Sequence, residues 1–320
     1  MPIIYKCPNC GAAMEFSSEL QKLECKRCGT SIDVKTYEDE YASLMEEVSG
    51  STSDNSDYGF NNSEQDNDAD NNNMKIYHCQ SCGAELVADE YTSATFCSYC
   101  GNPTLVEDRL KGSFRPKSII PFKINKDQAV DIYKKWLKKG MLTPKELSRK
   151  STIEKISGVY VPFWLFDLDT AGRFRYEATR TRIWDDEDYT YTETKFYHVV
   201  RSGKMKFEKI PVDGSRTIDD TTMEAIEPYD YKDLTEFNFS YLSGYLADKY
   251  DQEPDDLTER VYERMEKSVK DSFEKTVYGY ATVVPKQEKI TVTGKGKVKY
   301  ALFPVWFLNT KWNGKNYSFA

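Results

Sequence analysis

The eight cysteines of the chain are the residues best suited to chemistry, and every one belongs to a Cys-x-x-Cys pair. They form two sets, Cys7, Cys10, Cys25 and Cys28, followed by Cys79, Cys82, Cys97 and Cys100. In both sets 14 residues separate the pairs, and a glycine follows each pair. Four thiolates in a tetrahedron at ~2.3 Å are the ligands of a structural zinc, and a glycine lets the backbone turn back toward the sulfurs. The sequence therefore predicts two zinc ribbons, each with one structural Zn²⁺.

Two other uses of paired cysteines remain open at this stage, iron in a rubredoxin-like site and disulfides. The N-terminus lacks a basic segment followed by an apolar stretch, and no run of about 18 apolar residues occurs in the chain. We therefore expect a cytoplasmic protein, and a reducing compartment favours metal over disulfides.

Enzyme motifs are missing from the sequence. It has two histidines, no cysteine outside the two sets and no glycine-rich phosphate loop, so nucleophile–base chemistry has few candidates. A zinc with four thiolate ligands keeps no open position for a substrate. We expect no catalytic residues, no organic cofactor and no enzymatic activity.

The elements that must position the cysteines suggest a multidomain chain with two small β zinc ribbons and one α+β domain. The expected divisions are 1–35 for the first ribbon, 36–73 for a short helix and a tether, 74–107 for the second ribbon and 108–320 for the α+β domain. Residues 46–73 hold eight acids and neither lysine nor arginine. Such a polar segment predicts a disordered tether, with the ribbons as mobile recognition heads on a rigid α+β base.

Hydrophobic periodicity predicts the elements of the α+β domain. Long antiparallel strands are expected at 158–169, 172–184, 189–201 and 204–212, and further strands at 278–284 and 290–308. Turns are expected at Asp185–Asp188 and at Ser202-Gly203. Helices are expected at 126–139 with Asn125 as the N-cap, after Thr143-Pro144, at 219–226 and at 254–277.

An internal β-unit repeat adds a further prediction. The segment Pro162–Asp167 recurs as Pro304–Asn309 at an offset of 142 residues, and Gly172-Arg173 recurs as Gly314-Lys315. We interpret each copy as a strand, a turn and a returning strand. Because the second copy stops at Ala320, we expect the native chain to continue, and the α+β domain to be truncated here.

Charge is distributed unevenly along the chain. Residues 109–155 hold fourteen Lys/Arg and four acids, a net +10, whereas residues 219–259 hold thirteen acids and two bases, a net −11. The basic segment could contact phosphates of nucleic acid or of lipid headgroups. It could equally be the solvated face of a helix, or it could face the acidic segment.

The segments IIPFKINKDQAVDIYKKWL (119–137), GVYVPFWLFD (158–167), EPYDY (227–231) and FPVWFL (303–308), together with a Cys-x-x-Cys-Gly ribbon, resemble a bacterial family. Its members are labelled TFIIB-type zinc ribbon-containing proteins, and sometimes phage replisome organizers. The resemblance covers nearly the whole chain. The second ribbon and the long acidic tether depart from the usual pattern of the family.

The resemblance implies a membrane-tethered partner of phage-shock-type and stomatin-like envelope-stress proteins, with membrane helices beyond the equivalent of Ala320. We therefore expect a non-enzymatic adaptor or scaffold. It would act through protein–protein contacts at the cytosolic face of the membrane, tethered by residues beyond this chain. The alternative is a DNA- or RNA-binding protein that uses the ribbons and the basic 109–155 segment.

Overall fold

The computed structural model describes most of the chain outside the region between the two ribbons. The described residues are 2–3, 5–40, 74–78, 85–89, 92–96, 103–106, 115–139, 147, 149, 153, 156–216, 218, 220–293, 296–312 and 315–320. They fall into two compact units. Unit 1 comprises Met1–Val161, Ile218–Lys249 and Leu302–Ala320, and unit 2 comprises Pro162–Thr217 and Tyr250–Ala301. Neither unit is continuous in sequence, and each is described by itself.

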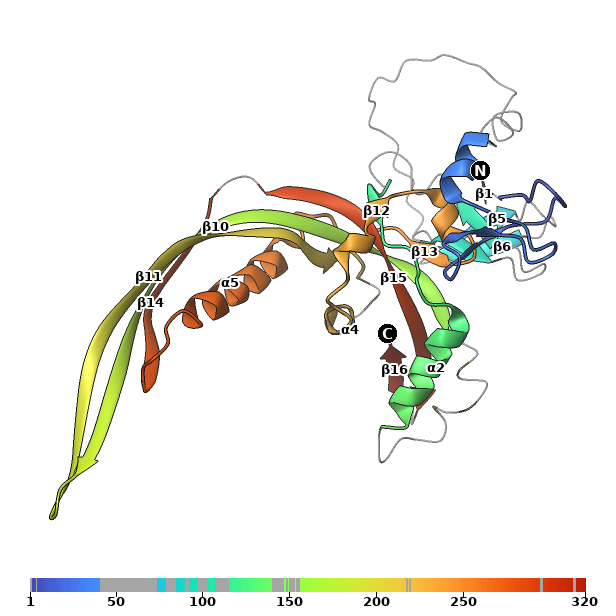
Figure 1. Cartoon of the computed structure of the whole chain (residues 1–320). Helices are drawn as coiled ribbons and strands as arrows, with labels where there is room; N and C mark the ends of the chain where they lie inside the picture. Colours follow the sequence, from blue (N-terminus) through green and yellow to red (C-terminus); the bar gives the residue numbers. More distant parts are fainter. Residues whose placement is uncertain are drawn as a thin grey trace, which may run out of the picture. The chain divides into compact units, whose positions relative to one another are not determined.

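Unit 1 is built from short strands and short helices (Figure 1). Its strands are β1 (Pro2–Ile3), β2 (Glu15–Ser17), β3 (Lys22–Glu24), β4 (Ser31–Ile32), β5 (Met74–His78), β6 (Glu85–Asp89), β7 (Thr92–Phe96), β8 (Pro103–Val106), β9 (Ser118–Ile119), β12 (Thr235–Glu236), β13 (Leu246–Asp248) and β16 (Lys315–Phe319). Its helices are α2 (Lys126–Leu137), α4 (Asp220–Ala225), η4 (Tyr231–Asp233) and η5 (Phe239–Leu242). Two long strands, β10 (Ser157–Asp185) and β15 (Lys297–Trp312), have residues in both units.

The strands of unit 1 form three sets. The order β2-β3-β4 makes a small antiparallel sheet, and β5 pairs with β6. A further path runs β1-β8-β7-β13 and continues to β10, which β13 joins in parallel at Val159↔Leu246. Strand β9 pairs with β12, and β15 pairs with β16.

Helix α2 forms as its sequence predicts. Asn125 caps it, because its side chain accepts a hydrogen bond from the Gln128 backbone N–H at 2.8 Å and the Gln128 side-chain oxygen accepts one from the Asn125 backbone N–H at 2.9 Å. Ala129, Tyr133 and Leu137 lie four residues apart and are buried against the unit. The predicted helix and its cap are confirmed, and the helix ends two residues before the predicted Lys139.

Unit 2 is a long hairpin with a third strand and a helix. Strand β11 (Thr190–Asp213) pairs antiparallel with β10 from Phe163↔Asp213 to Asp185↔Thr190. Strand β14 (Thr282–Val292) pairs with β10 over Thr170–Thr179. Helix α5 (Thr258–Glu274) lies along one face of these strands (Figure 1). Its residues Val261, Met265, Val269 and Phe273 are buried, as spacing of four predicts.

Two predicted turns of unit 2 are wrong. Strand β10 runs straight through Gly172, and β11 runs through Ser202-Gly203, with Gly172 directly opposite Gly203. Both glycines lie beneath the ring of Phe273, and a Cβ on Gly172 would come within 2.6 Å of it. Gly172 therefore admits an aromatic ring to the sheet surface, and neither glycine marks a turn. The four strands predicted between residues 158 and 212 are therefore two long strands, β10 and β11. The predicted turn at Asp185–Asp188, which connects them, is confirmed.

Other predictions are met with shifted bounds. The helix expected at 219–226 is α4, and that at 254–277 is α5, which begins at Thr258. After Gly172 there is no returning strand, whereas β16 does return beside β15. Helical residues 34–40 begin the helix expected between the ribbons. The acidic tether and the helix expected after Thr143-Pro144 lie outside the described residues.

Candidate metal centre

The first ribbon holds its cysteines on two turns with the same hydrogen-bond pattern. The Cys7 N–H donates to the Ala12 carbonyl and the Gly11 N–H to the Cys7 carbonyl, at 2.7 and 2.8 Å. Eighteen residues later, Cys25 and Gly29 repeat both bonds at 2.8 Å. Gly11 and Gly29 have φ of 69° and 74°, which a glycine adopts without strain. The predicted role of these two glycines is confirmed.

The two turns bring the four thiols of Cys7, Cys10, Cys25 and Cys28 together. Their sulfurs all lie within 4.8 Å of one another, and the closest pairs, Cys7–Cys28 and Cys10–Cys25, are 3.5 Å apart. Bonds of ~2.3 Å from a tetrahedral zinc would separate sulfurs by about 3.8 Å. A disulfide requires about 2.05 Å, so these thiols are not cross-linked. The donor set and its spacing fit one structural zinc.

Thr30 supports the ligand Cys28 directly. The Thr30 hydroxyl lies 3.1 Å from the Cys28 sulfur and, together with the Thr30 backbone N–H, lowers the pKa of this thiol to about 6. The Thr30 hydroxyl also accepts a hydrogen bond from the Asn9 side chain at 2.9 Å, which links the two turns. A lowered pKa favours the thiolate, the form that binds metal.

The second predicted site consists of Cys79, Cys82, Cys97 and Cys100. All four lie outside the described residues. The strands that flank them are described, and β5 and β6 pair from Met74↔Asp89 to His78↔Glu85. The second zinc therefore stays a prediction.

The first ribbon is built into unit 1 by backbone and side-chain contacts. The Phe16 N–H donates to the Ser243 carbonyl at 2.8 Å, and the Ser243 hydroxyl donates to the Met14 carbonyl at 2.7 Å. The Gln21 side chain donates to the Phe122 carbonyl at 2.9 Å. The expectation of a freely mobile head does not hold for this ribbon, because its strand β2 is bonded to the segment around η5. The sequence carries no signal for these contacts between distant segments.

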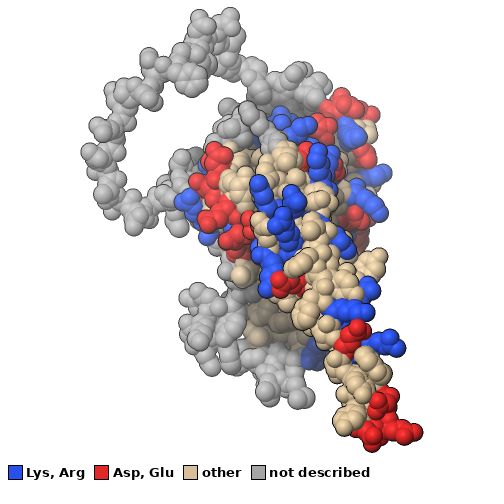
Figure 2. Space-filling model, turned by 90° about the vertical axis from the view of Figure 1, so that its left-hand side faces the viewer, with Lys and Arg blue, Asp and Glu red and all other residues tan. Residues whose placement is uncertain are grey.

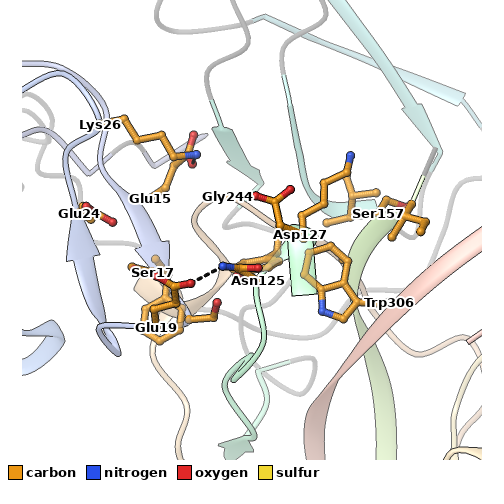
Figure 3. A pocket seen from close by; sticks show the side chains of 17 residues that line it. Glu15, Ser17, Glu19, Glu24, Lys26, Asn125, Asp127, Ser157, Gly244 and Trp306 are labelled. Atoms are coloured by element: carbon orange, nitrogen blue, oxygen red, sulfur yellow. Dashed lines mark hydrogen bonds and ion pairs between the residues drawn. The ribbon is translucent and has the colours of Figure 1, made fainter. Parts of the chain in front are cut away.

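A cleft of about 590 Å³ lies between the ribbon and the start of α2 (Figure 3). Carboxylates from three elements line it, Glu15 on β2, Glu24 on β3 and Asp127 on α2. The rings of Tyr245 and Trp306 form an aromatic part of the wall. Sequence reasoning missed these residues because they come from segments with no shared motif.

Two interactions tie the rim of the cleft together. Lys26 makes an ion pair with Glu15 within the ribbon. The Asn125 side-chain amide donates to Glu19 across the cleft rim, the contact drawn as a dashed line in Figure 3. Gly158 lets the aromatic wall close, since a Cβ there would lie 2.7 Å from the Tyr245 ring. The cleft is thus a shaped feature of unit 1, lined by carboxylates, by the lysines Lys26 and Lys126 and by two aromatic rings.

One curated protein matches the whole chain. The Bacillus subtilis (strain 168) protein with the printed name Uncharacterized protein YdjG is 35% identical over 320 residues, which is 100% of this chain and 87% of YdjG. The chain belongs to the YdjG family. No protein-family profile and no solved structure matches it. The four-cysteine cluster supports the zinc-ribbon part of the resemblance noted above.

The basic segment of this YdjG-family chain meets the acidic segment within unit 1. Strand β9 pairs with β12 at Ile119↔Thr235, and Lys123 makes an ion pair of 2.5 Å with Asp233. Other lysines of the segment, Lys135, Lys138 and Lys139 among them, are exposed on or just after α2. Part of the positive charge is therefore matched inside the unit, and part faces solvent.

No described helix combines the length and the apolar character that crossing a bilayer requires.

Proposed function

We propose that the chain is a non-enzymatic zinc-ribbon adaptor that acts by protein–protein contacts at the cytosolic face of the membrane. Its ribbons would bind two structural Zn²⁺, the second through Cys79, Cys82, Cys97 and Cys100. The partner would be a stomatin-like or phage-shock-type envelope-stress protein. The observation that carries the proposal is the closed four-thiolate cluster in a ribbon that is bonded into unit 1 beside a cleft.

The closed cluster supports a structural role for the metal. Four thiolates complete the tetrahedron, so the zinc has no position for a water or a substrate. The ribbon has only a small core, which includes Met14 and Leu23, and metal binding adds folding free energy of about 10–16 kcal/mol in apparent terms. The ordered ribbon then forms one wall of the cleft.

The cleft supports a binding function. Its carboxylates, Glu15, Glu24 and Asp127, line the same cleft as the rings of Tyr245 and Trp306, together with Lys26 and Lys126. A lysine or arginine of a partner would gain ion pairs with the carboxylates and a cation–π contact with the rings. We propose that a basic segment of the partner protein binds here.

Binding of DNA or RNA is the second candidate. The exposed lysines at the end of α2 favour it, because a cluster of cations contacts phosphates regardless of sequence. The ion pair of Lys123 with Asp233 and the acidic surroundings weigh against it. The two candidates differ in salt dependence, which is steep for nucleic acid.

Affinity capture with the full chain tests the proposal. The wild-type protein, Glu24→Lys in the cleft and Glu38→Lys on an exposed helical turn away from it would be compared, with partners identified by mass spectrometry. A stomatin-like or phage-shock-type protein retained by wild type and Glu38→Lys but lost with Glu24→Lys supports the adaptor. Equal capture by all three, or capture of neither class of protein, contradicts it. Binding of a random duplex tighter than micromolar at physiological salt would favour the second candidate.

A further inference from the structure

Strand β11 is an edge of the sheet in unit 2. Among the described residues it pairs only with β10, which leaves one row of its backbone groups without a strand partner. Edge strands are usually protected by lysines, prolines or bulges, because a free edge pairs with other strands. Strand β14, at the opposite edge, contains Pro285, and its register with β10 shifts next to this proline. The two halves of β11 differ in this respect.

The half of β11 nearest the acidic turn is the more regular of the two. Residues 204–213 contain Lys204, Lys206, Pro211 and an irregularity at Lys209, whose φ is 59°. Residues 190–202 contain one lysine, Lys195, and no proline, and their register with β10 is unbroken. A regular edge without a proline or a bulge is suited to the addition of a further strand.

The same half carries large apolar side chains in solvent. Phe196 is 80% exposed. On the neighbouring strand β10, Thr179 lies directly opposite Phe196 and Thr181 lies opposite Thr194. Val200 on β11 and Ile183 on β10 are exposed on the same face. Figure 2 shows a mostly uncharged surface along this hairpin, with acidic atoms at its end. Exposed apolar side chains spaced along a free edge suit an interface.

We propose that two copies of this chain pair through β11, antiparallel and centred on Thr194. In that register Glu193 of each copy lies opposite Lys195 of the other, and Tyr191 lies opposite Tyr197. Opposite charges and aromatic pairs across strands stabilise a sheet. A shift of the centre to Glu193 or to Lys195 would place like charges directly opposite each other. Charge therefore selects this register over its neighbours.

The opposite face of the paired strands is equally self-complementary. Thr192 of each copy lies opposite Phe196 of the other, and Thr194 lies opposite itself on the twofold axis. A β-branched residue against an aromatic ring is a favourable cross-strand pair. The pairing covers Phe196, which a single copy leaves in solvent. Each copy contributes the same patch, as a twofold interface requires.

The acidic turn gives an independent reason for the antiparallel direction. The four consecutive residues Asp185–Asp188 at the end of the hairpin are all acidic. In the paired state this turn extends toward Arg201 and Lys204 of the second copy. A parallel arrangement would bring the two acidic turns together. An anionic lipid surface would repel the same turn, so the chemistry of the hairpin end favours a second copy as the occupant.

Cysteine cross-linking of the full chain tests the register. Opposite residues of an antiparallel pair have Cα atoms about 4.5–5.5 Å apart, within the range of a disulfide. Thr194→Cys should therefore give a symmetric disulfide between copies on mild oxidation, identified by mass spectrometry of the linked peptides. The matched control is Thr181→Cys, directly opposite Thr194 on the inner strand. Three strand spacings would separate the two copies of this position by about 14 Å, so it should not cross-link.

Exchanging the charges at positions 193 and 195 gives a second test, in which dimerisation is measured and the hairpin stays intact. Glu193→Lys and Lys195→Glu should each weaken dimerisation about tenfold in analytical ultracentrifugation, because each places like charges opposite one another twice. The double variant E193K/K195E should restore the wild-type dissociation constant. A monomeric wild-type protein at 100 µM-scale concentration, equal cross-linking of both cysteine variants, or failure of the double variant to recover would each overturn the proposal.

Discussion

The first ribbon and the β10–β11 hairpin hold their strands in contrasting ways. In the ribbon, β2, β3 and β4 have two or three residues each, and four sulfurs within 4.8 Å accompany a few buried apolar side chains, among them Met14, Phe16 and Leu23. In the hairpin, backbone pairing extends from Phe163↔Asp213 to Asp185↔Thr190, and α5 packs along one face. Order in the ribbon depends mainly on the metal cluster and a few buried side chains, whereas order in the hairpin is distributed over many contacts. Single lesions should therefore have very different effects in the two regions.

Loss of one metal ligand is the largest expected effect. Cys25 is fully buried in the cluster, and Cys25→Ser should abolish this zinc site and unfold the ribbon, since metal binding is worth about 10–16 kcal/mol. Zinc content by native mass spectrometry should fall by one ion per chain, and amide exchange should become fast across residues 5–32. The hairpin amides of unit 2 should keep their protection.

The control for the ribbon is Lys26→Ala, next to the ligand in sequence. Lys26 is exposed and makes a surface ion pair with Glu15, a contact worth at most about 1 kcal/mol. Zinc content should stay unchanged in this variant. A Cys25→Ser protein that kept its full zinc content would contradict the assignment of the cluster.

A large core deletion in the hairpin region should have the next largest effect. Phe273 is buried against Phe174, with ring centroids 4.5 Å apart. Phe273→Ala should lower the unfolding free energy of unit 2 by about 3–5 kcal/mol, through lost burial and the cavity left behind. Tyr262→Ala on the same helix removes a side chain that is 40% exposed and should have a much smaller effect. Urea denaturation followed by circular dichroism measures both, and equal losses would show that α5 does not pack as described.

The glycine pair beneath Phe273 should respond unequally to one added methyl group. Gly172→Ala places a Cβ 2.6 Å from the ring and should destabilise unit 2 by about 1–3 kcal/mol by overpacking. Gly203→Ala places a Cβ at 3.6 Å, an ordinary contact, and should be nearly neutral. Comparison of the two urea midpoints checks the ring position, and a reversed order would refute it.

Loss of the α2 cap should have the smallest effect. The cap belongs to unit 1 and lies next to the ribbon. Asn125→Ala removes the bond to the Gln128 N–H and should lower stability by about 1 kcal/mol. Asn125→Asp keeps the cap but replaces the amide that donates to Glu19 by a like charge. If the ribbon contact matters, Asn125→Asp should increase amide exchange in residues 15–21 while α2 stays protected. Unchanged exchange there would indicate that the cap alone matters.

The local features of this chain could be predicted from its sequence. Cys-x-x-Cys-Gly turns and the Asn125 cap are encoded within a few residues, so the first cluster and α2 agree with expectation. Gly172 and Gly203 could not be interpreted correctly, because a missing side chain signals either a turn or the close approach of a distant group. The deciding residue, Phe273, lies about a hundred positions away from Gly172.

The cleft beside the ribbon was also beyond sequence reasoning. Its walls come from the ribbon, from the start of α2 and from the Tyr245 segment, which meet only in the folded unit. None of Glu24, Asp127 or Trp306 belongs to a motif whose spacing indicates a common site. Contacts between distant segments follow from packing, and periodicity reports only which face of each element is buried.

The division of the chain into interleaved units has a consequence for its biogenesis. The chain passes from one unit to the other after Val161, Thr217, Lys249 and Ala301. A ribosome releases residues in order, so the cysteines of the first ribbon emerge before the Ser243 carbonyl to which Phe16 donates. Zinc capture needs only local turns, whereas contacts of long sequence separation form slowly. Metal insertion would then be the first folding event on the nascent chain, and unit 1 would be completed last, when Leu302–Ala320 leaves the exit tunnel.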